Sequence, residues 1–204
     1  MGYNKNSYSA VFGDLCQEIV IKFMTKEYGW TWIAGERNSK VENQGLFSVL
    51  KNFVKIRTEK EPKIEFVDTD GWNNLVLMPD ELFMSENSYN LTEIKGRDRS
   101  SQNGNKDIFE KKVKIDAYSR TKREFQIPVW LIFCLSKGNG YNIYISDIDN
   151  AIENASQSYY VQRYGQDEYG NFFEKTYKTY LWKTPAGFKK LNKVLLPENY
   201  LEVE

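Results

Sequence analysis

The chain has 204 residues, a length that suits one domain of ordinary size with an appendage. Its 28 basic and 28 acidic side chains give a formal net charge of +0, so no global basic field indicates a nucleic-acid partner. Histidine is absent, which excludes a Ser-His-Asp triad, a Cys-His dyad and a zinc-deaminase site. Carboxylates and lysines must therefore perform the chemistry if this is an enzyme. The two cysteines, Cys16 and Cys134, lie in separate apolar segments and are expected to be buried free thiols.

Targeting signals are not evident in the sequence. No apolar run approaches the length of a membrane span, and the first six residues lack the apolar region of a signal peptide. We therefore expect a soluble cytoplasmic protein with no membrane partner. High Asn, Lys and Tyr usage suggests an AT-rich viral or prokaryotic genome.

The first third of the chain begins with a predicted helix. Apolar residues at helical spacing predict it over 11–27, and Gly29 follows as its stop. The next segment has no clear period: residues 30–33 are compatible with a strand and 47–56 with a short helix. Residues 63–67 alternate in polarity, as a half-buried strand does.

The middle third predicts a β-meander followed by a helix. The meander consists of three short apolar strands at 75–78, 81–84 and 91–94. A polar loop over 96–106 follows. Asp107 and Glu110 have the spacing of a capping box, which predicts a helix from Asp107 to about Phe125.

The last third alternates strands with short helices. The unbroken apolar run Val129–Leu135 predicts a strand buried on both faces, and 141–145 the next strand. Asp147 is placed to cap a short helix over 148–155.

Residues 156–204 are rich in tyrosine. A hairpin around 165–170, a strand at 172–182 and a final helix at 188–195 are the expected elements.

A possible active site lies in the predicted meander, where Asp80 follows Pro79 and precedes Glu93-Ile94-Lys95. Alternate residues of a strand share a face, so Glu93 and Lys95 point together while Ile94 points into a core. An acid and a lysine that face a second acid on the neighbouring strand make a place for a divalent cation, a water and a phosphate.

Two neighbouring acids are weaker candidates than Asp80. Asp70 also precedes an apolar strand, but it lies in an Asp-Gly turn and much farther from Glu93. Glu81 would point to the face opposite Asp80. Taken alone, Asp80 is typical of an acid in a turn and Lys95 of an exposed lysine at a strand end. The order of these two residues with Glu93 favours an active site.

The element order and the acid spacing resemble the PD-(D/E)xK nuclease superfamily, the restriction-endonuclease-like fold. The resemblance covers about residues 10–150, and no individual family is assigned: Holliday junction resolvases, phage and virus exonucleases and restriction enzymes share this core. It rests on Pro79-Asp80, on Glu93-Ile94-Lys95, on the first helix with Glu18, and on Lys114–Tyr118 followed by Ile127–Phe133.

The resemblance implies an α/β fold with a restriction-endonuclease-like core in the order helix, three-stranded meander, helix, strand, strand. This nuclease core would span 1–155, and a Tyr-rich C-terminal addition at 156–204 would pack on it and serve as a candidate homodimer interface.

The resemblance also implies a nuclease that cuts DNA with Mg²⁺ or Mn²⁺, more in keeping with an endonuclease than an exonuclease. Asp80, Glu93 and the Ile94 backbone carbonyl would bind the metal. Lys95 would orient the attacking water, and Glu18 would complete the site or hold a second ion. Without the resemblance, Glu18 reads as a solvated residue at the edge of an apolar stripe.

Basic residues follow the candidate site, with ten basic against four acidic residues between 95 and 123. Arg97 and Arg99 share the face of Lys95 and are candidate phosphate contacts. Lys114, Tyr118 and Lys122 recur every four residues and could line a DNA-binding helix face, although a solvated face has the same pattern. The C-terminal tyrosines could stack on unpaired bases, but tyrosines at this density more often belong to strand core and rim.

Two other classes of function are also compatible with the sequence. A non-catalytic DNA-binding or assembly protein could keep the same fold. A domain that binds a protein partner could have the same composition and would bind neither a metal nor DNA.

Overall fold

The structure is a computed structural model. It describes residues 8–35, 66–69, 72–76, 79–86, 88–97, 108–137, 140–166, 170, 172–182 and 187–195. The possible helix at 47–56, Asp70, Arg99 and most of the polar loop lie outside the described residues.

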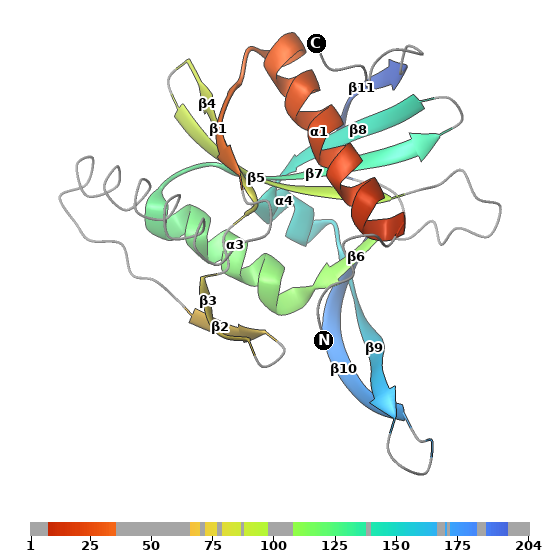
Figure 1. The fold of residues 1–204 in the computed structure, drawn as a ribbon. Coiled ribbons are helices and arrows are strands. Elements are labelled where there is room, and N and C mark those ends of the chain that lie inside the picture. Colours follow the sequence, from red (N-terminus) through yellow and green to blue (C-terminus); the bar gives the residue numbers. More distant parts are fainter. Residues whose placement is uncertain are drawn as a thin grey trace.

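The core is a mixed six-stranded sheet in a fold that contains both helices and strands, with sheet predominating (Figure 1). Its strands run in the order β1-β4-β5-β7-β8-β11. The central neighbours β5 and β7 are parallel, and every other pair in this sheet is antiparallel. The strands span Thr31–Gly35 (β1), Glu81–Ser85 (β4), Ser88–Arg97 (β5), Val129–Lys137 (β7), Gly140–Asp147 (β8) and Lys189–Leu195 (β11).

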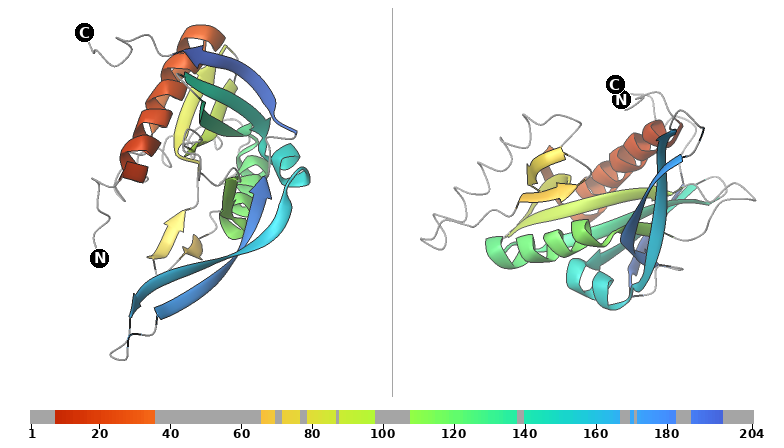
Figure 2. Two further views of the ribbon diagram at one scale, coloured as in Figure 1. Left: turned by 90° about the vertical axis from the view of Figure 1, so that its right-hand side faces the viewer. Right: turned by 90° about the horizontal axis from the view of Figure 1, so that it is seen from below.

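Helix α1, Tyr8–Tyr28, covers one face of this sheet (Figure 2). It buries an apolar stripe against the strands, and the buried set is Cys16, Ile19, Val20, Phe23, Met24, Ile94, Ile132, Cys134 and Ile143. Gly29 follows the helix at φ 66°, a conformation that glycine adopts without steric cost. No helix in the described ranges is long and apolar enough to cross a membrane.

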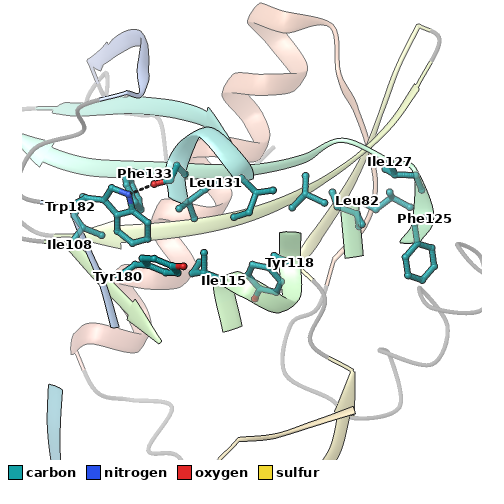
Figure 3. Packing of buried hydrophobic residues seen from close by; sticks show 14 of the residues in the cluster. Leu82, Ile108, Ile115, Tyr118, Phe125, Ile127, Leu131, Phe133, Tyr180 and Trp182 are labelled. Carbon is teal, nitrogen blue, oxygen red and sulfur yellow. Dashed lines mark hydrogen bonds between the residues drawn. The ribbon is translucent and has the colours of Figure 1, made fainter. Parts of the chain in front are cut away.

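Helices α3, Lys112–Phe125, and α4, Ile148–Glu153, cover the opposite face. Figure 3 shows their cluster, in which Ile115 and Tyr118 of α3 lie over Leu131 and Phe133 of β7. Trp182 packs at the end of the cluster, and its indole N–H donates to the Ala151 carbonyl at 2.8 Å. The helix α3 crossover joins the two parallel strands β5 and β7, as parallel pairing requires.

Two smaller sheets complete the fold. Strands β6 (Ile108–Lys111), β10 (Phe172–Trp182) and β9 (Ser156–Gln166) form one in the order β6-β10-β9, and the β9–β10 hairpin extends away from the main sheet in Figures 1 and 2. Strands β2 (Phe66–Thr69) and β3 (Trp72–Val76) form the other.

Several predicted elements are confirmed. The first helix, the buried strand beginning at Val129, the strand after it and the hairpin with the strand at 172–182 are present. Asp147 caps α4 by accepting a hydrogen bond from the Asp149 backbone N–H at 3.0 Å. Both cysteines are buried free thiols.

Two element predictions are wrong, and a third is right in type but wrong in its pairing. The strand predicted at 75–78 overlaps strand β3, but β3 pairs with β2, and β1 supplies the third strand beside β4 and β5. The capping box at Asp107 does not start a helix, because Ile108–Lys111 pair with β10 as strand β6. The final helix at 188–195 is strand β11, which extends the main sheet beside β8. The C-terminal addition thus contributes a strand to the core sheet.

Candidate functional site

A fully buried carboxylate, Glu93, lies at the centre of the candidate site. Alternation along β5 turns Glu93 and Lys95 toward α3 and Ile94 toward α1. The Lys95 ammonium lies 2.5 Å from Glu93 Oε1 and 3.0 Å from Glu110 Oε2. Lys95 therefore bridges two acids from two strands of different sheets.

Helix α3 supplies two further donors to Glu93. The Lys114 ammonium donates to Glu93 Oε1 at 2.8 Å, and the Tyr118 hydroxyl donates to Oε2 at 2.8 Å. These residues are four positions apart and so lie on the same side of the helix. Both oxygens of the carboxylate are thereby hydrogen-bonded, as burial of a charge demands.

Asp80 completes the site from the residue just before β4. The antiparallel register pairs Glu81 with Thr92, which brings the preceding Asp80 beside Glu93 on the neighbouring strand. The two carboxyl groups are hydrogen-bonded to each other. Burial and the adjacent Glu93 charge together raise the pKa of Asp80 to about 7.

Each charged group of the site lies beside a group of opposite charge. Burial acts to raise the pKa of Glu93, but Lys114 and Lys95 outweigh it and hold that pKa well below its usual range. Burial acts to lower the lysine pKa values, but the Glu93 charge keeps both above their usual range. Glu93 is thus ionised while its neighbour Asp80 carries a proton near neutral pH.

The two adjacent carboxyl groups fit a hard divalent cation. Magnesium sites commonly use one or two protein carboxylates and keep several waters, so Asp80 and Glu93 suffice as ligands. The raised pKa of Asp80 reflects burial beside the negative charge of Glu93, and a cation bound between the two carboxyl groups would offset that charge. Among the described residues, no group of three or more Asp, Glu, Cys or His side chains is placed to hold a metal ion.

Of the predicted site residues, the structure brings Asp80, Glu93 and Lys95 together. The Ile94 side chain packs in the cluster beneath α1, as expected for the residue between them, and ligation by its backbone carbonyl stays a prediction. Glu81 also points to the α1 side, where the Gln17 amide and the Trp32 indole N–H donate to its carboxylate.

Glu18 does not join the site in this structure. It lies on α1, whose buried stripe faces Ile94, whereas Glu93 faces α3 across the sheet. Its carboxylate pairs with Lys22 at 3.1 Å, one turn along the same helix, and its side chain is 38% exposed. The prediction of an accessory acid at Glu18 is not supported by this geometry.

The predicted DNA-binding helix face is divided between two sites. Lys114 and Tyr118 point into the candidate site and bind Glu93. Lys122 instead pairs with Asp147 and Asp149 at 2.7 Å, which ties α3 to the start of α4. Lys122 is therefore part of the contact between α3 and α4, and its contact with DNA stays a prediction.

The remaining predicted contact is Arg97, since Arg99 lies outside the described residues. The Arg97 guanidinium donates to the carbonyl of Gly96 at 2.9 Å and to that of Phe109 at 3.4 Å. It also lies 5.6 Å from the centre of the Phe109 ring. Arg97 thus reaches from β5 to the neighbouring strand β6.

Glu110 is the site residue that the sequence interpretation missed. The capping-box spacing assigned it to a helix start, whereas pairing with β10 makes it a strand residue that turns toward Lys95. Its own pKa is lowered because the Lys95 and Lys114 charges outweigh the effect of burial. If Ile108-Phe109-Glu110-Lys111 is treated as a strand with alternating side chains, Glu110 lies on the same face as the apolar Ile108.

Substitution of Asp80 by Asn is expected to remove a loss of folding stability that the wild-type protein shows as pH rises. With a folded pKa of about 7 and an ordinary value of 3.8, wild-type Asp80 keeps its proton in the folded state while the unfolded chain loses it. Stability from this group is therefore present at acidic pH and falls as pH rises through the window between the two values. In EDTA, the free energy of unfolding of Asp80→Asn should exceed that of wild type increasingly from pH 4.5 to pH 7.5, measured by urea unfolding. A difference that does not change with pH would contradict the assignment.

Substitution of Tyr118 by Phe should weaken the fold at neutral pH. The change removes the hydroxyl donor to the buried, ionised Glu93 and is expected to cost about 1.5–3 kcal/mol of unfolding free energy. Tyr159→Phe, at a tyrosine that is 69% exposed, is the matched control and should stay within about 0.5 kcal/mol of wild type. Equal stabilities of the two variants in urea unfolding would show that the Tyr118 hydroxyl does not support a charged Glu93.

The structural neighbours of the chain include a Holliday junction resolvase that is only weakly similar to it. No protein-family model and no curated protein matches the chain. Among solved structures, the chain is similar to Hjc from Archaeoglobus fulgidus, a Holliday junction resolvase from an archaeal hyperthermophile that was solved at 1.6 Å resolution. The two share 8% identity with a TM-score of 0.33, over 74% of this chain and 90% of that one. A TM-score of this size does not establish a common fold, so the function has to be argued from the site itself.

Proposed function

We propose that the protein is a metal-dependent nuclease that hydrolyses phosphodiester bonds of DNA with a metal-activated water. The observation that carries the proposal is the meeting of Asp80, Glu93 and Lys95 at one point. The Asp80 and Glu93 carboxyl groups interact there, and the Lys95 ammonium lies 2.5 Å from Glu93 Oε1. Two acids for a divalent ion beside a lysine for the phosphate are the parts that metal-assisted phosphodiester hydrolysis requires.

The arrangement of elements supports a restriction-endonuclease-like fold for the proposed PD-(D/E)xK nuclease. Helix α1 is followed by three strands of the main sheet, β1, β4 and β5, and then by α3, β7 and β8. This is the order that the resemblance implies, with the β2–β3 hairpin inserted between β1 and β4 and strand β6 inserted between β5 and α3. The two acids come from the neighbouring strands β4 and β5, at the start of one and the middle of the other.

Each side chain of the site has a defined task in this proposal. Asp80 and Glu93 would hold Mg²⁺ or Mn²⁺, which when bound supplies a Lewis acid for the phosphate and a water of lowered pKa. Lys95 would offset negative charge on the phosphate and orient the water. Lys114 and Tyr118 keep the Glu93 carboxylate ionised and in place, and Glu110 holds Lys95.

The charge of the site also favours an anionic substrate with a divalent ion. With Asp80 protonated, the charges of Glu93 and Glu110 cancel those of Lys95 and Lys114. Exchange of the Asp80 proton for a divalent cation would leave the group with one positive charge. One phosphodiester, which carries a single negative charge, would then make the site neutral.

Cleavage of supercoiled plasmid, single-stranded circular DNA and a branched junction in Mg²⁺, Mn²⁺ or EDTA tests the proposal. We expect cutting that depends on metal and that includes the circular substrates, as an endonuclease requires. Glu93→Gln and Lys95→Ala should each lower the rate by about a hundredfold or more, because each removes a charge beside the phosphate.

Glu18→Gln is the matched control, because it removes an acid of α1 that lies away from Glu93. It should cut like wild type. Binding of DNA without cutting in any metal would overturn the proposal and leave a non-catalytic DNA-binding protein. Cutting that survives Glu93→Gln would place the catalytic centre elsewhere.

A further inference from the structure

The β9–β10 hairpin extends away from the main sheet (Figure 1), and it exposes aromatic side chains along its length. Its end nearest the core is packed, with Tyr180 and Trp182 at 5% and 1% exposure. Farther along, Tyr159, Tyr160, Val161, Phe172 and Phe173 are between 41% and 69% exposed. A group of large apolar residues this exposed on one element indicates a contact surface.

The strand register sorts these residues onto two faces. Lys111 pairs with Thr179 of β10, which pairs in turn with Ser158 of β9. Since side chains alternate, one face carries Phe109 and Lys111 of β6, Lys175 and Tyr177 of β10, and Tyr160 and Gln162 of β9. We call this set the outer face. The opposite face carries Glu110 and Tyr180, which turn toward α3.

Aromatic rings on the outer face form a stacking surface. The Phe109 and Tyr160 rings stack across β10, with centroids 5.0 Å apart and planes inclined by 26°. Phe109 thus supports one side of Tyr160, which is still 41% exposed. An exposed ring held in this way loses little freedom when another flat ring stacks on it.

Cations are positioned beside these rings. The Lys111 and Lys175 ammonium groups lie 4.0 Å and 5.3 Å from the centre of the Tyr177 ring, and the Arg97 guanidinium lies 5.6 Å from that of Phe109. From Lys175 to Leu181 of β10, and at the paired positions of β9 and β6, no residue on the outer face is acidic. The face is therefore basic and aromatic together, although the whole chain is neutral.

The outer face begins where the candidate site ends. Arg97 is two residues beyond Lys95 on β5 and points to the same side, and it reaches Phe109 on β6. Glu110, which bonds Lys95, lies between Phe109 and Lys111. Arg97 therefore links the strand that carries Lys95 to the outer face, which extends about 20 Å from Leu181 to Lys175 of β10.

We propose that the outer face binds a single-stranded segment of DNA next to the phosphodiester that is cut. Bases stack on Tyr160, and phosphates contact Arg97, Lys111 and Lys175. Stacking on aromatic rings with cations nearby is the mode by which proteins hold unpaired strands without regard to sequence. This inference rests on the proposed nuclease function and deepens it, because it makes the substrate DNA with an unpaired strand, tailed or branched, in place of continuous duplex.

Binding of a fluorescently labelled oligothymidine in EDTA, measured by anisotropy, tests the stacking surface. Tyr160→Ala should raise the dissociation constant about fivefold or more, the effect of losing one stacked base. Tyr160→Phe keeps the ring and should bind like wild type. Tyr159→Ala removes the neighbouring tyrosine from the opposite face and should also bind like wild type. A fully paired duplex should be bound equally by all four proteins.

Salt dependence tests the cations separately. Lys111→Gln and Lys175→Gln should each reduce the slope of log affinity against log salt by about 0.7 for the single strand. Unchanged slopes, or equal oligothymidine affinities for Tyr160→Ala and Tyr159→Ala, would overturn the stacking site. Metal-dependent plasmid cutting by the same wild-type preparation would leave the nuclease proposal standing in that case. The reverse result, Tyr160-dependent binding with no cutting, would retain the surface and remove the nuclease.

Discussion

Burial of the ionised Glu93 carboxylate is the constraint on which the rest of the site depends. A carboxylate that is removed from water must be matched by donors, or it takes up a proton. Here Lys95, Lys114 and Tyr118 match it, and they come from the same strand and from the crossover helix that follows. The helix α3 is thereby bound to β5 by charge as well as by its apolar face.

The same constraint separates the behaviour of two neighbouring acids. Lys95 and Lys114 both bond to Glu93, which stays ionised. Asp80 therefore lies beside the negative charge of Glu93 and has less positive charge nearby to stabilise its own ionised form. Asp80 therefore holds its proton to a higher pH than Glu93 does. Environment, more than residue type, gives the two acids different charge states. Glu110 extends this pattern, since it brings strand β6 and the base of the hairpin to the site through Lys95.

Local patterns in the sequence predicted the parts of the site that depend on one strand. Period-two alternation placed Glu93 and Lys95 on one face and Ile94 in the core, and an apolar run predicted the buried strand β7. Pairings between distant segments were not accessible in the same way. Glu110 has the local signature of a helix start, and only its pairing with β10 makes it a strand residue. The expected position of Glu18 beside the site also depends on distant segments, because a helical wheel shows the side of α1 on which a residue lies but not which face of the sheet the helix covers.

Calorimetric titration of Mn²⁺ into the wild-type protein and Glu93→Gln would detect metal binding at Asp80 and Glu93 without requiring any particular DNA. We expect a saturable site in wild type whose binding releases a proton near pH 6, since Asp80 must lose its proton, and loss of that site in Glu93→Gln. Binding that persists unchanged in Glu93→Gln, or no binding to wild type, would show that these two carboxyl groups do not hold a metal.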